Sequence, residues 1–523
     1  METNASQRVC VIGAGLAGLA TAKVLQADGF DVTVFEKVPR VGGVWLPSRT
    51  YPELRTNTAR EEYAFSDFPQ PESADDYPTA DQVLSYIESY VDHFELHDAI
   101  HLSTEVTSVS RAERNGTEAH PGFQVTVRPS DGSGEEETHH FDFVAVCNGL
   151  FSDPYIPQIE GTERFSGSIL HSSQFTDAEM VEGKRVIVVG AGKSAVDCAA
   201  VAAKHARSCT SVFRSPKWMM PQYLGGIRSD WLFFNRFTES LYRYHHLGPI
   251  ESIFHGPLRP LLRLYWRIQR WTLQHLFLRI PSALVPDKPL RGSINVGVGA
   301  DFYEAVREEK VVPKRAEIDS FAGGSTVELS TGEQIEADLV IFATGYQHHV
   351  PFLDKDLRDL VREDGHFHLY RRILPPEEHR LGFVGYTGTF INSLVIEIAA
   401  HWLSECFLGE LDLPGKDEME REIEHVRQWS EEHFPSAKGG LLLGPFTAHY
   451  VDDLMRDMDL EAHRTDNLLA EHFGRLLPSR YKDVGRERRQ ARRKTDVDRP
   501  KEKMGALQQE MDGEDQQPVE QRQ

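Results

Sequence analysis

The fold of this chain is decided by Arg8-Val9-Cys10-Val11-Ile12-Gly13-Ala14-Gly15-Leu16-Ala17-Gly18. An apolar run meets Gly-x-Gly-x-x-Gly, and a helix-forming segment, 19–26, follows. This order of strand, tight turn and helix is typical of a dinucleotide site, because the glycines let the backbone approach a pyrophosphate at the helix N-terminus. The next predicted strand ends at Glu36, an acid suited to a ribose hydroxyl. We expect contacts to the cofactor from Gly13, Ala14, Gly15, Leu16, Gly18 and Glu36.

The same pattern returns in a second unit, which runs from Arg185 to Asp197. Here Ala195 replaces the third glycine and is small enough for helix–strand packing. The following strand ends at Arg214 rather than at an acid. Because Arg offers a planar cationic fork, this position favours the 2′-phosphate of NADP, although a surface Arg paired with a carboxylate is the alternative. Two dinucleotide turns imply two nucleotides, so NADPH is assigned to the second turn and FAD to the first.

Composition excludes several other classes of protein. The chain has 523 residues, 40% of them apolar, and a net charge of −23, which argues against non-specific nucleic-acid binding. Its five cysteines include no CxxC pair, which removes the flavin disulfide reductases and fits a reducing compartment. No signal peptide and no apolar run long enough to span a membrane is visible. We therefore expect a cytoplasmic protein.

The order of motifs predicts an α/β protein with two Rossmann-like doubly wound domains, the second interrupted by a helical insert. The expected boundaries are residues 1–160 for the first part of the FAD-binding domain, 161–345 for the NADPH-binding domain, 346–478 for the second part of the FAD-binding domain, and 479–523 for a disordered charged tail. The tail is rich in charged residues and Gln, a composition that cannot bury enough apolar surface to fold.

The insert, at about residues 218–286, is locally basic in an acidic protein. From Trp231 to Pro286 it carries seven Arg and no Lys against two Glu. Three interpretations stay open. The favoured one is a helical cap that shapes an apolar substrate tunnel; the others are a subdomain with solvated arginines and an amphipathic face on a membrane surface. Peripheral membrane contact is thus an alternative that we do not favour, and the oligomeric state is not predicted.

Further motifs carry a resemblance to a known family. They are Gly42-Gly43-Val44-Trp45, Thr56-Asn57, Phe65-Ser66-Asp67-Phe68-Pro69, Ala343-Thr344-Gly345-Tyr346 and, before the second glycine turn, Phe165-x-Gly167-x-x-x-His171-x-x-x-Phe175. With them the chain, from about Val9 to Leu460, resembles the flavin-containing monooxygenases and their Baeyer–Villiger relatives, the class B flavoprotein monooxygenases.

The resemblance implies that NADPH reduces FAD, that O₂ adds to give a C4a-(hydro)peroxyflavin, and that one oxygen atom passes to a small organic substrate. It implies a catalytic position for Asn57 beside flavin and nicotinamide. His171 would act in the linker between the domains or be a buried structural residue. The other cofactor contacts expected are Gly43, Val44, Trp45, Thr56, Thr58, Val106, Gly190, Gly192, Lys193, Ser194, Asp197, Arg214 and Thr344.

The motifs divide between two subgroups. Asn57 and Phe175 resemble the enzymes that oxidise nitrogen or sulfur, whereas Tyr51-Pro52 resembles the ketone-oxidising enzymes. A late helix has Ala399-Ala400-His401-Trp402 where the family often has Gln-x-Arg-Trp. We expect oxygenation at nitrogen or sulfur. The alternatives are Baeyer–Villiger oxidation of a ketone, an NADPH oxidase that releases peroxide, and a non-catalytic flavoprotein.

Overall fold

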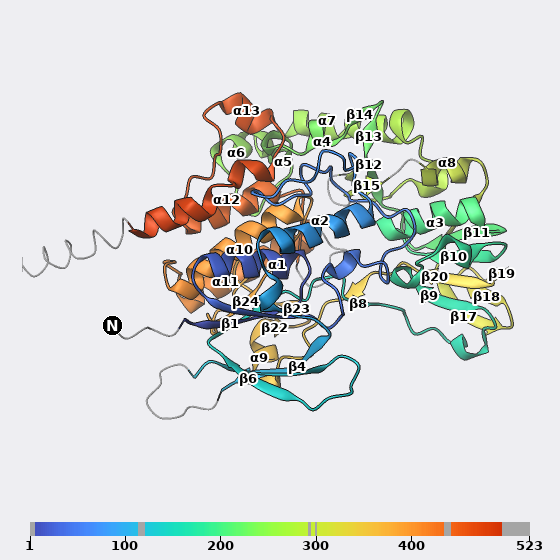
Figure 1. Ribbon diagram of the computed structural model, residues 1–523. Coiled ribbons are helices and arrows are strands. Elements are labelled where there is room, and N and C mark those ends of the chain that lie inside the picture. The colour runs from blue at the N-terminus through green and yellow to red at the C-terminus, as the bar shows by residue number, and fades with distance from the viewer. Residues whose placement is uncertain (1–5, 113–120, 291–293, 299–300, 434–440, 494–523) are drawn as a thin grey trace, which may run out of the picture.

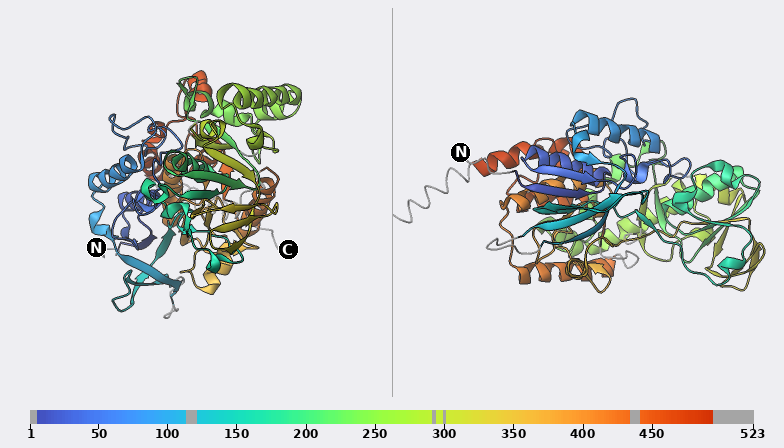
Figure 2. Two further views of the ribbon diagram at one scale, coloured as in Figure 1. Left: turned by 90° about the vertical axis from the view of Figure 1, so that its right-hand side faces the viewer. Right: turned by 60° about the horizontal axis from the view of Figure 1, so that its bottom comes forward.

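Two parallel β-sheets organise the molecule and lie in separate halves of it (Figures 1 and 2). The computed structural model describes residues 6–112, 121–290, 294–298, 301–433 and 441–493. Each sheet has five strands and ends, at its carboxyl edge, in one of the two glycine turns. The architecture is therefore the predicted pair of doubly wound units.

The first sheet has the strand order β24-β7-β1-β2-β3, all parallel. Its strands are β1 Arg8–Ile12, β2 Asp31–Phe35, β3 Ile100–His101, β7 Phe143–Val146 and β24 Leu381–Phe383. Strand β24 arrives from late in the chain, so the C-terminal part of the sequence completes a sheet that the N-terminal part begins. Because β1 lies at the centre, the Gly13 turn opens between two neighbouring strands.

Both faces of this sheet are buried, as in other parallel sheets. Val9 and Val11 pack with helices, while Cys10 and Ile12 pack on the opposite face against an antiparallel sheet, because side chains alternate along a strand. The helices are α1 Leu16–Ala27, α2 Ala80–His93, α10 Asn392–Leu408 and α12 Thr447–Asp457, and the antiparallel strands are β4 Thr104–Arg111, β5 Phe123–Pro129 and β6 Glu137–Phe141.

The second sheet repeats this layering, with the order β16-β11-β10-β20-β9. Its strands are β9 Ser168–His171, β10 Arg185–Val189, β11 Ser208–Phe213, β16 Val311–Arg315 and β20 Leu339–Phe342. Helices cover one face and a three-stranded antiparallel sheet covers the other. These are α3 Lys193–His205 and α8 Asp301–Arg307, and β17 Ile318–Gly323, β18 Thr326–Leu329 and β19 Gln334–Glu336.

The insert leaves the second sheet but packs on the C-terminal part of the chain. Arg236 pairs with Asp452 at 2.5 Å and with Glu471 at 2.7 Å, and the Leu476 N–H donates to the Phe234 carbonyl at 2.9 Å. The elements of the insert are β12 Trp218–Pro221, β13 Tyr223–Leu224, β14 Ile227–Arg228, α4 Asp230–Phe233, α5 Arg236–Ser240, α6 Pro249–His255, α7 Arg259–Trp271 and a π-helix Thr272–Phe277; β12 pairs with β15 Ile294–Val298.

Short elements join these layers. They are β8 Asp153–Pro154 paired with β21 Tyr346–Gln347, α9 Lys355–Val361, β22 Arg362–Glu363 paired with β23 His366–Phe367, β25 Gly388–Thr389 paired with β26 Leu442–Gly444, α11 Lys416–His433 and α13 Leu468–Phe473. No helix of the described residues has both the length and the hydropathy needed to cross a membrane.

The C-terminal segment differs from the expected disordered tail over its described part. Residues 484–493 are helical, and Arg488 is buried between Asp28, at 2.6 Å, and Glu405, at 2.5 Å. The physical reason is that Arg488 pairs with Asp28, which follows α1 and lies 460 residues earlier, and with Glu405 on α10, which lies 83 residues earlier. Residues 494–523 of the predicted tail lie outside the described residues.

Candidate functional site

The first glycine turn is held by contacts that leave no room for side chains. Gly13 has φ +104°, and a Cβ there would lie 2.8 Å from the Cys147 carbonyl oxygen. A Cβ at Gly18 would lie 1.8 Å from the Gly13 carbonyl oxygen. Helix α1 can therefore approach β1 only with glycine at these positions. Its N-terminus has no side-chain cap and no acid in its first turn, so it suits an anion.

Glu36 and the Gly42-Gly43 turn complete this cradle. The buried Glu36 carboxylate accepts hydrogen bonds from the Ala14 N–H, at 2.7 Å, and the Val38 N–H, at 3.1 Å. An ionised carboxylate has further lone pairs for ribose hydroxyls. The Gly42 N–H donates to the Ala14 carbonyl at 3.1 Å, and a Cβ at Gly43 would lie 3.2 Å from Gly15 Cα. The cofactor contacts predicted in the Gly13 turn and in the Gly42-Gly43 turn thus lie close together.

The loop after Trp45 places Asn57 at the surface of the site. Trp45 is buried and donates from Nε1 to the Tyr63 hydroxyl at 2.9 Å, next to the half-buried Val44. Thr56 and Thr58 are buried, and the Thr56 hydroxyl donates to the Thr58 carbonyl at 2.8 Å. Asn57 between them is exposed. The two threonines therefore fix the loop so that the intervening side chain faces outward.

The second glycine turn has the same construction. Gly190 has φ +136°, and a Cβ there would lie 2.4 Å from the Ala343 carbonyl oxygen. A Cβ at Gly192 would meet no protein atom within 4 Å, and α3 begins without a side-chain cap and with no acid in its first turn. Lys193 pairs with Asp197, which also accepts a hydrogen bond from the Tyr51 hydroxyl at 2.9 Å. Asp197 thus joins the second unit to the first; Ser194 follows Lys193 in the first turn of α3.

A cluster of cations lies beyond this turn. Arg214 is 77% exposed and has a 3.5 Å ion pair with Glu317. Burial lowers the pKa of Lys217, and the positive charges of Lys288 and Arg214 lower it further. Lys217 thus lies close to two other cations, and such a cluster fits an anionic group such as a 2′-phosphate. Sequence reasoning named Arg214 for this role but not Lys288, because the insert separates the two residues in the sequence.

Three predicted contacts lie in the supporting structure. Nδ1 of the buried His171 accepts from the Ser173 N–H at 3.2 Å, and its Nε2 lies 3.0 Å from the Gly345 carbonyl. Burial lowers the pKa of this ring, so it is neutral and joins β9 to the segment after β20. Thr344, in that segment, donates to the Tyr155 carbonyl. Val106 is buried in β4, in the core beneath the first sheet.

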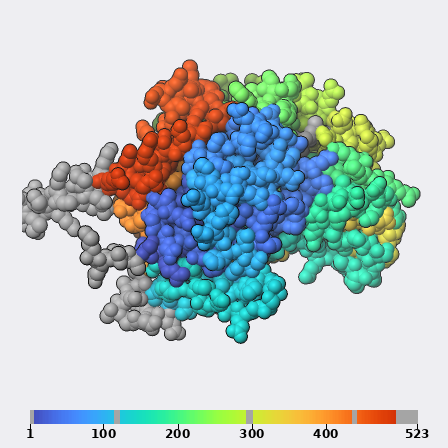
Figure 3. Space-filling model, in the orientation of Figure 1, coloured from blue at the N-terminus to red at the C-terminus, as the bar shows by residue number. Residues whose placement is uncertain are grey.

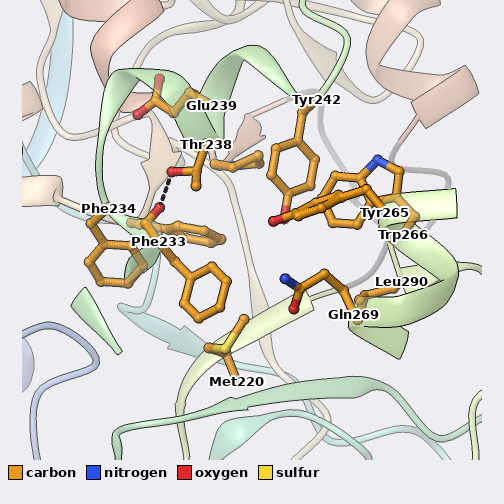
Figure 4. Close-up of a pocket in the computed structure, with 12 residues that line it drawn as sticks. Met220, Phe233, Phe234, Thr238, Glu239, Tyr242, Tyr265, Trp266, Gln269 and Leu290 are labelled. Atoms are coloured by element: carbon orange, nitrogen blue, oxygen red, sulfur yellow. Dashed lines mark hydrogen bonds between the residues drawn. The ribbon is translucent and has the colours of Figure 1, made fainter. Parts of the chain in front are cut away.

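A pocket lies between the insert and two residues from later in the chain, Phe390 and Pro445 (Figure 4). Its lining is mainly aromatic and apolar: Met220, Phe233, Phe234, Thr238, Glu239, Tyr242, Tyr265, Trp266, Gln269, Leu290, Phe390 and Pro445. The Thr238 hydroxyl donates to the Phe233 carbonyl at 2.6 Å. Glu239 is the one charged lining residue, and its carboxylate accepts from the Ala448 N–H and pairs with His449. Sequence reasoning identified the insert but not this pocket, because Phe390 and Pro445 lie at least 100 residues after the other residues that line it.

Comparisons with known proteins agree with this geometry. A family model described as flavin-binding monooxygenase-like matches residues 6–249 and 306–494. A probable flavin-containing monooxygenase 1 from Arabidopsis thaliana is 30% identical over 541 residues, which cover 93% of this chain and 98% of the relative. A 4-hydroxybenzoate brominase (decarboxylating) from Marinomonas mediterranea is 28% identical over 461 residues, covering 86% and 83%.

A solved structure shares the fold. The OTEMO complex with FAD and NADP matches with a TM-score of 0.64 at 19% identity, covering 87% of this chain and 98% of that one. The comparisons confirm the predicted resemblance, the two-Rossmann-domain fold, the FAD and NADP(H) cofactors and the assignment to flavin-dependent oxidoreductases. Both glycine turns fit such groups, since a Cβ at Gly15 would be no closer than 3.7 Å to any protein atom and the space at Gly192 is open.

Proposed function

The chain belongs to the flavin-binding monooxygenase-like family, and we propose that it uses NADPH and O₂ to oxygenate a nitrogen or sulfur atom of an apolar small molecule held in the aromatic pocket. The observation that carries this proposal is the character of that pocket. Its walls are aromatic, and its single charged residue is already bound to protein groups. Such a pocket suits a substrate that supplies its own lone pair.

We assign FAD to the first turn and NADPH to the second. Gly13, Ala14, Gly15, Leu16, Gly18, Glu36 and Gly43 would hold the FAD phosphates and ribose, and Val44, Trp45, Thr56 and Thr58 would line its ring. Gly190, Gly192, Lys193, Ser194 and Asp197 would form the NADPH turn, with Arg214 on the 2′-phosphate. When bound, the flavin supplies electron transfer from the nicotinamide and activation of O₂.

One wall of the pocket is connected to the loop that carries Asn57. Met220 forms one wall, and two residues later the Gln222 side-chain amide donates to the Thr56 carbonyl at 3.3 Å. Because Asn57 follows Thr56 and is exposed, it is the side chain best placed to orient a group between the cofactors and the pocket. The insert and this loop would together exclude water from the reacting substrate.

The same pocket argues against ketone oxidation as the leading function. Attack on a ketone by an anionic oxidant needs cations that hold the anion. Among the described residues, the pocket wall contains no Lys or Arg. Lys288 belongs instead to the cluster with Lys217. A nitrogen or sulfur substrate requires no such group.

The proposal is tested with the FAD-loaded protein, NADPH and ¹⁸O₂. An aryl methyl thioether, a tertiary arylamine and a cyclic ketone are offered as separate substrates. We expect ¹⁸O in the sulfoxide or N-oxide, with O₂ consumption matching product. Label in an ester or lactone instead would identify a ketone-oxidising enzyme, and stoichiometric H₂O₂ without labelled product would identify an NADPH oxidase.

The pocket itself is tested with two substitutions. Tyr242→Trp would fill space in the pocket, while Val312→Trp changes an exposed residue of β16 and is the control. We expect Tyr242→Trp to raise KM for the thioether about tenfold, because a difference of one methylene group in an apolar pocket is worth roughly 1–3 kcal/mol. NADPH oxidation without substrate should persist. An unchanged KM would place the substrate elsewhere.

A further inference from the structure

The segment 242–246 of the insert contributes to two pockets. Tyr242 lines the aromatic pocket, whereas Tyr244 and His245 line a second one, whose other walls come from residues 366–372, α11 and α12. The insert and the segment that carries α12 lie side by side at one edge of the molecule (Figures 1 and 3). Residues that are about 200 positions apart in sequence therefore face each other at the second pocket.

Three side chains of the kinds that ligate metals meet at this second pocket. One ligand atom from each of His245, His246 and Asp453 lies within 4.8 Å of the other two. The closest pair is His246 Nε2 and Asp453 Oδ1, at 3.0 Å. Tetrahedral ligands about 2.0–2.1 Å from a zinc ion lie about 3.4 Å from one another, so the His245 ring would have to move by at most about 1.4 Å. Asp453 is buried and His246 is 45% exposed, so an ion can enter from solvent.

The His245 ring is available as a ligand. Within the residues that the structure describes, its side chain has no hydrogen bond or ion pair, and it packs against the rings of Tyr244, at 4.1 Å, and His246, at 4.7 Å. Burial and the neighbouring His246 lower the pKa of His245 to about 3, so the ring is neutral at physiological pH. Metal ions bind the neutral form of imidazole. A bound cation would therefore give this half-buried ring a polar partner.

The Asp453 carboxylate is held in place by its neighbours. The Tyr244 hydroxyl donates to Oδ2 at 3.0 Å, a contact of the kind that orients metal ligands. Arg456 donates to Oδ1 at 2.8 Å and is 57% exposed, so it would compete with a metal ion for this oxygen. Arg371 and Arg372 also line the pocket, although Arg371 already pairs with two other acids. These cations would make binding weaker than at a structural zinc site with four ligands.

We propose that His245, His246 and Asp453 bind a divalent transition-metal cation of the Zn²⁺ type, with solvent completing its coordination. Two imidazoles and one carboxylate suit such borderline cations, whereas Mg²⁺ and Ca²⁺ prefer oxygen ligands alone. The ion would join the insert to α12 next to Tyr242, and would thus fix one wall of the aromatic pocket. Its binding does not depend on the reaction that the protein catalyses.

The experiment is calorimetric titration of the full-length, FAD-loaded protein, without an affinity tag, with ZnCl₂ in a buffer that does not chelate metals. We expect saturable binding of Zn²⁺ that is lost when MgCl₂ replaces ZnCl₂. His246→Asn should weaken the binding about 100-fold, the upper range for loss of a group that supports a metal ligand. Arg456→Gln should strengthen it about two- to fivefold, because the exposed cation that competes for Asp453 is removed.

The matched control is His463→Asn/His472→Asn, which changes another pair of neighbouring histidine rings, 5.7 Å apart. It should bind Zn²⁺ like the wild type. Zn²⁺ should raise the thermal midpoint of the wild type and the control but not that of His246→Asn, and all variants should keep their midpoint in EDTA.

Three results would overturn the proposal. The first is a wild type without saturable Zn²⁺ binding. The second is equal Zn²⁺ affinity in His246→Asn and the control, which would mean that scattered histidines bind the ion. The third is weaker binding in Arg456→Gln, which would show that the ion does not lie at Asp453.

Discussion

Gly15 and Gly18 are expected to respond differently to alanine. A methyl at Gly18 overlaps the Gly13 carbonyl oxygen at 1.8 Å, so Gly18→Ala must displace α1 and should destabilise the protein by about 3 kcal/mol. A methyl at Gly15 comes no closer than 3.7 Å to protein, and the residue has the extended φ of −83°. Gly15→Ala should keep the thermal midpoint of the apoprotein but lose FAD. The ratio of flavin to protein absorbance measures the FAD content of each variant, and the thermal midpoint of the apoprotein measures its stability. Normal FAD content in Gly15→Ala would place the phosphates elsewhere.

Arg214 and Lys288 should determine the choice of nicotinamide cofactor. Replacing either by Ala removes a charge from the cluster around Lys217 and should lower kcat/KM for NADPH by roughly 10- to 100-fold, because a charge-assisted hydrogen bond contributes about 1.5–3 kcal/mol. The kcat/KM for NADH should not change. Steady-state kinetics with both cofactors measure this, and Arg207→Ala, an exposed arginine on the same unit, is the control. An equal loss with NADPH and NADH would show that the cluster binds no 2′-phosphate.

At the level of elements, His449 ties the insert to α12. Its Nδ1 lies 3.1 Å from Glu239 on α5 and its Nε2 lies 2.5 Å from Glu251 on α6. Burial opposes charge on this ring, but the two carboxylates outweigh it and raise the pKa of His449 to about 10. The charged ring thus connects α12 with α5 and α6. One of its two partners, Glu239, also lines the pocket.

The pH dependence of stability follows from this shift. A raised folded-state pKa contributes stability that is complete below the ordinary His value, about 6.5, and is lost as the pH rises toward 10. The thermal midpoint of the wild type should therefore decrease as the pH is raised from 6.5 to 10. His449→Gln should lower the midpoint at pH 6.5 and make the midpoint depend less steeply on pH. Midpoints of wild type and variant across this range test it. If the midpoints of wild type and variant change equally with pH, a group other than His449 causes the pH dependence. His205→Gln, at the end of α3, is the control.

Elements were predicted from sequence where local pattern alone decides them. Residues 394–407 are an apolar run of helical length, and α10 is observed as Asn392–Leu408. Thr79 and Gln82 have the residue types and spacing of a capping box, and both reciprocal hydrogen bonds are present at the start of α2. The insert was predicted to be helical from its composition, but the exposed position of Leu264 and Ile268 could not be. Helical spacing places them on one face and does not say whether that face is covered.

For the whole molecule, the two parallel sheets could be predicted from the sequence because each turn sterically requires glycine. Such a requirement can be recognised directly, since only one residue type meets it. The return of β24 to the first sheet was predicted only in outline, and the pocket and Lys288 were not, because contacts between residues far apart in sequence leave no periodic signal. The charged segment after residue 478 illustrates this most directly. Its composition indicates a solvated chain, yet 484–493 form a helix against α1 and α10.

Arg488 gives the sharpest test of how that helix is held. It is 1% exposed and neutralises Asp28, which is 0% exposed, and Glu405. Arg488→Met keeps the volume but leaves the two buried carboxylates with Arg492, at 2.9 and 3.4 Å, the more distant Arg489, and the Ser404 hydroxyl, which donates to Asp28 at 2.6 Å. Because an uncompensated buried charge costs about 3–5 kcal/mol and Arg492 retains part of the pairing, we expect a loss of about 3 kcal/mol.

The matched control for this change is Arg489→Met, since Arg489 is 42% exposed and lies 3.5 Å from Asp28. It should change stability by no more than about 0.5 kcal/mol. Urea unfolding followed by flavin fluorescence and by tryptophan fluorescence measures both variants. If Arg488→Met releases the C-terminal helix alone, limited proteolysis will cut it before FAD is lost. If the helix is part of the first domain's core, both probes will shift together. We expect this result, because Arg488 pairs with Asp28 from the first unit.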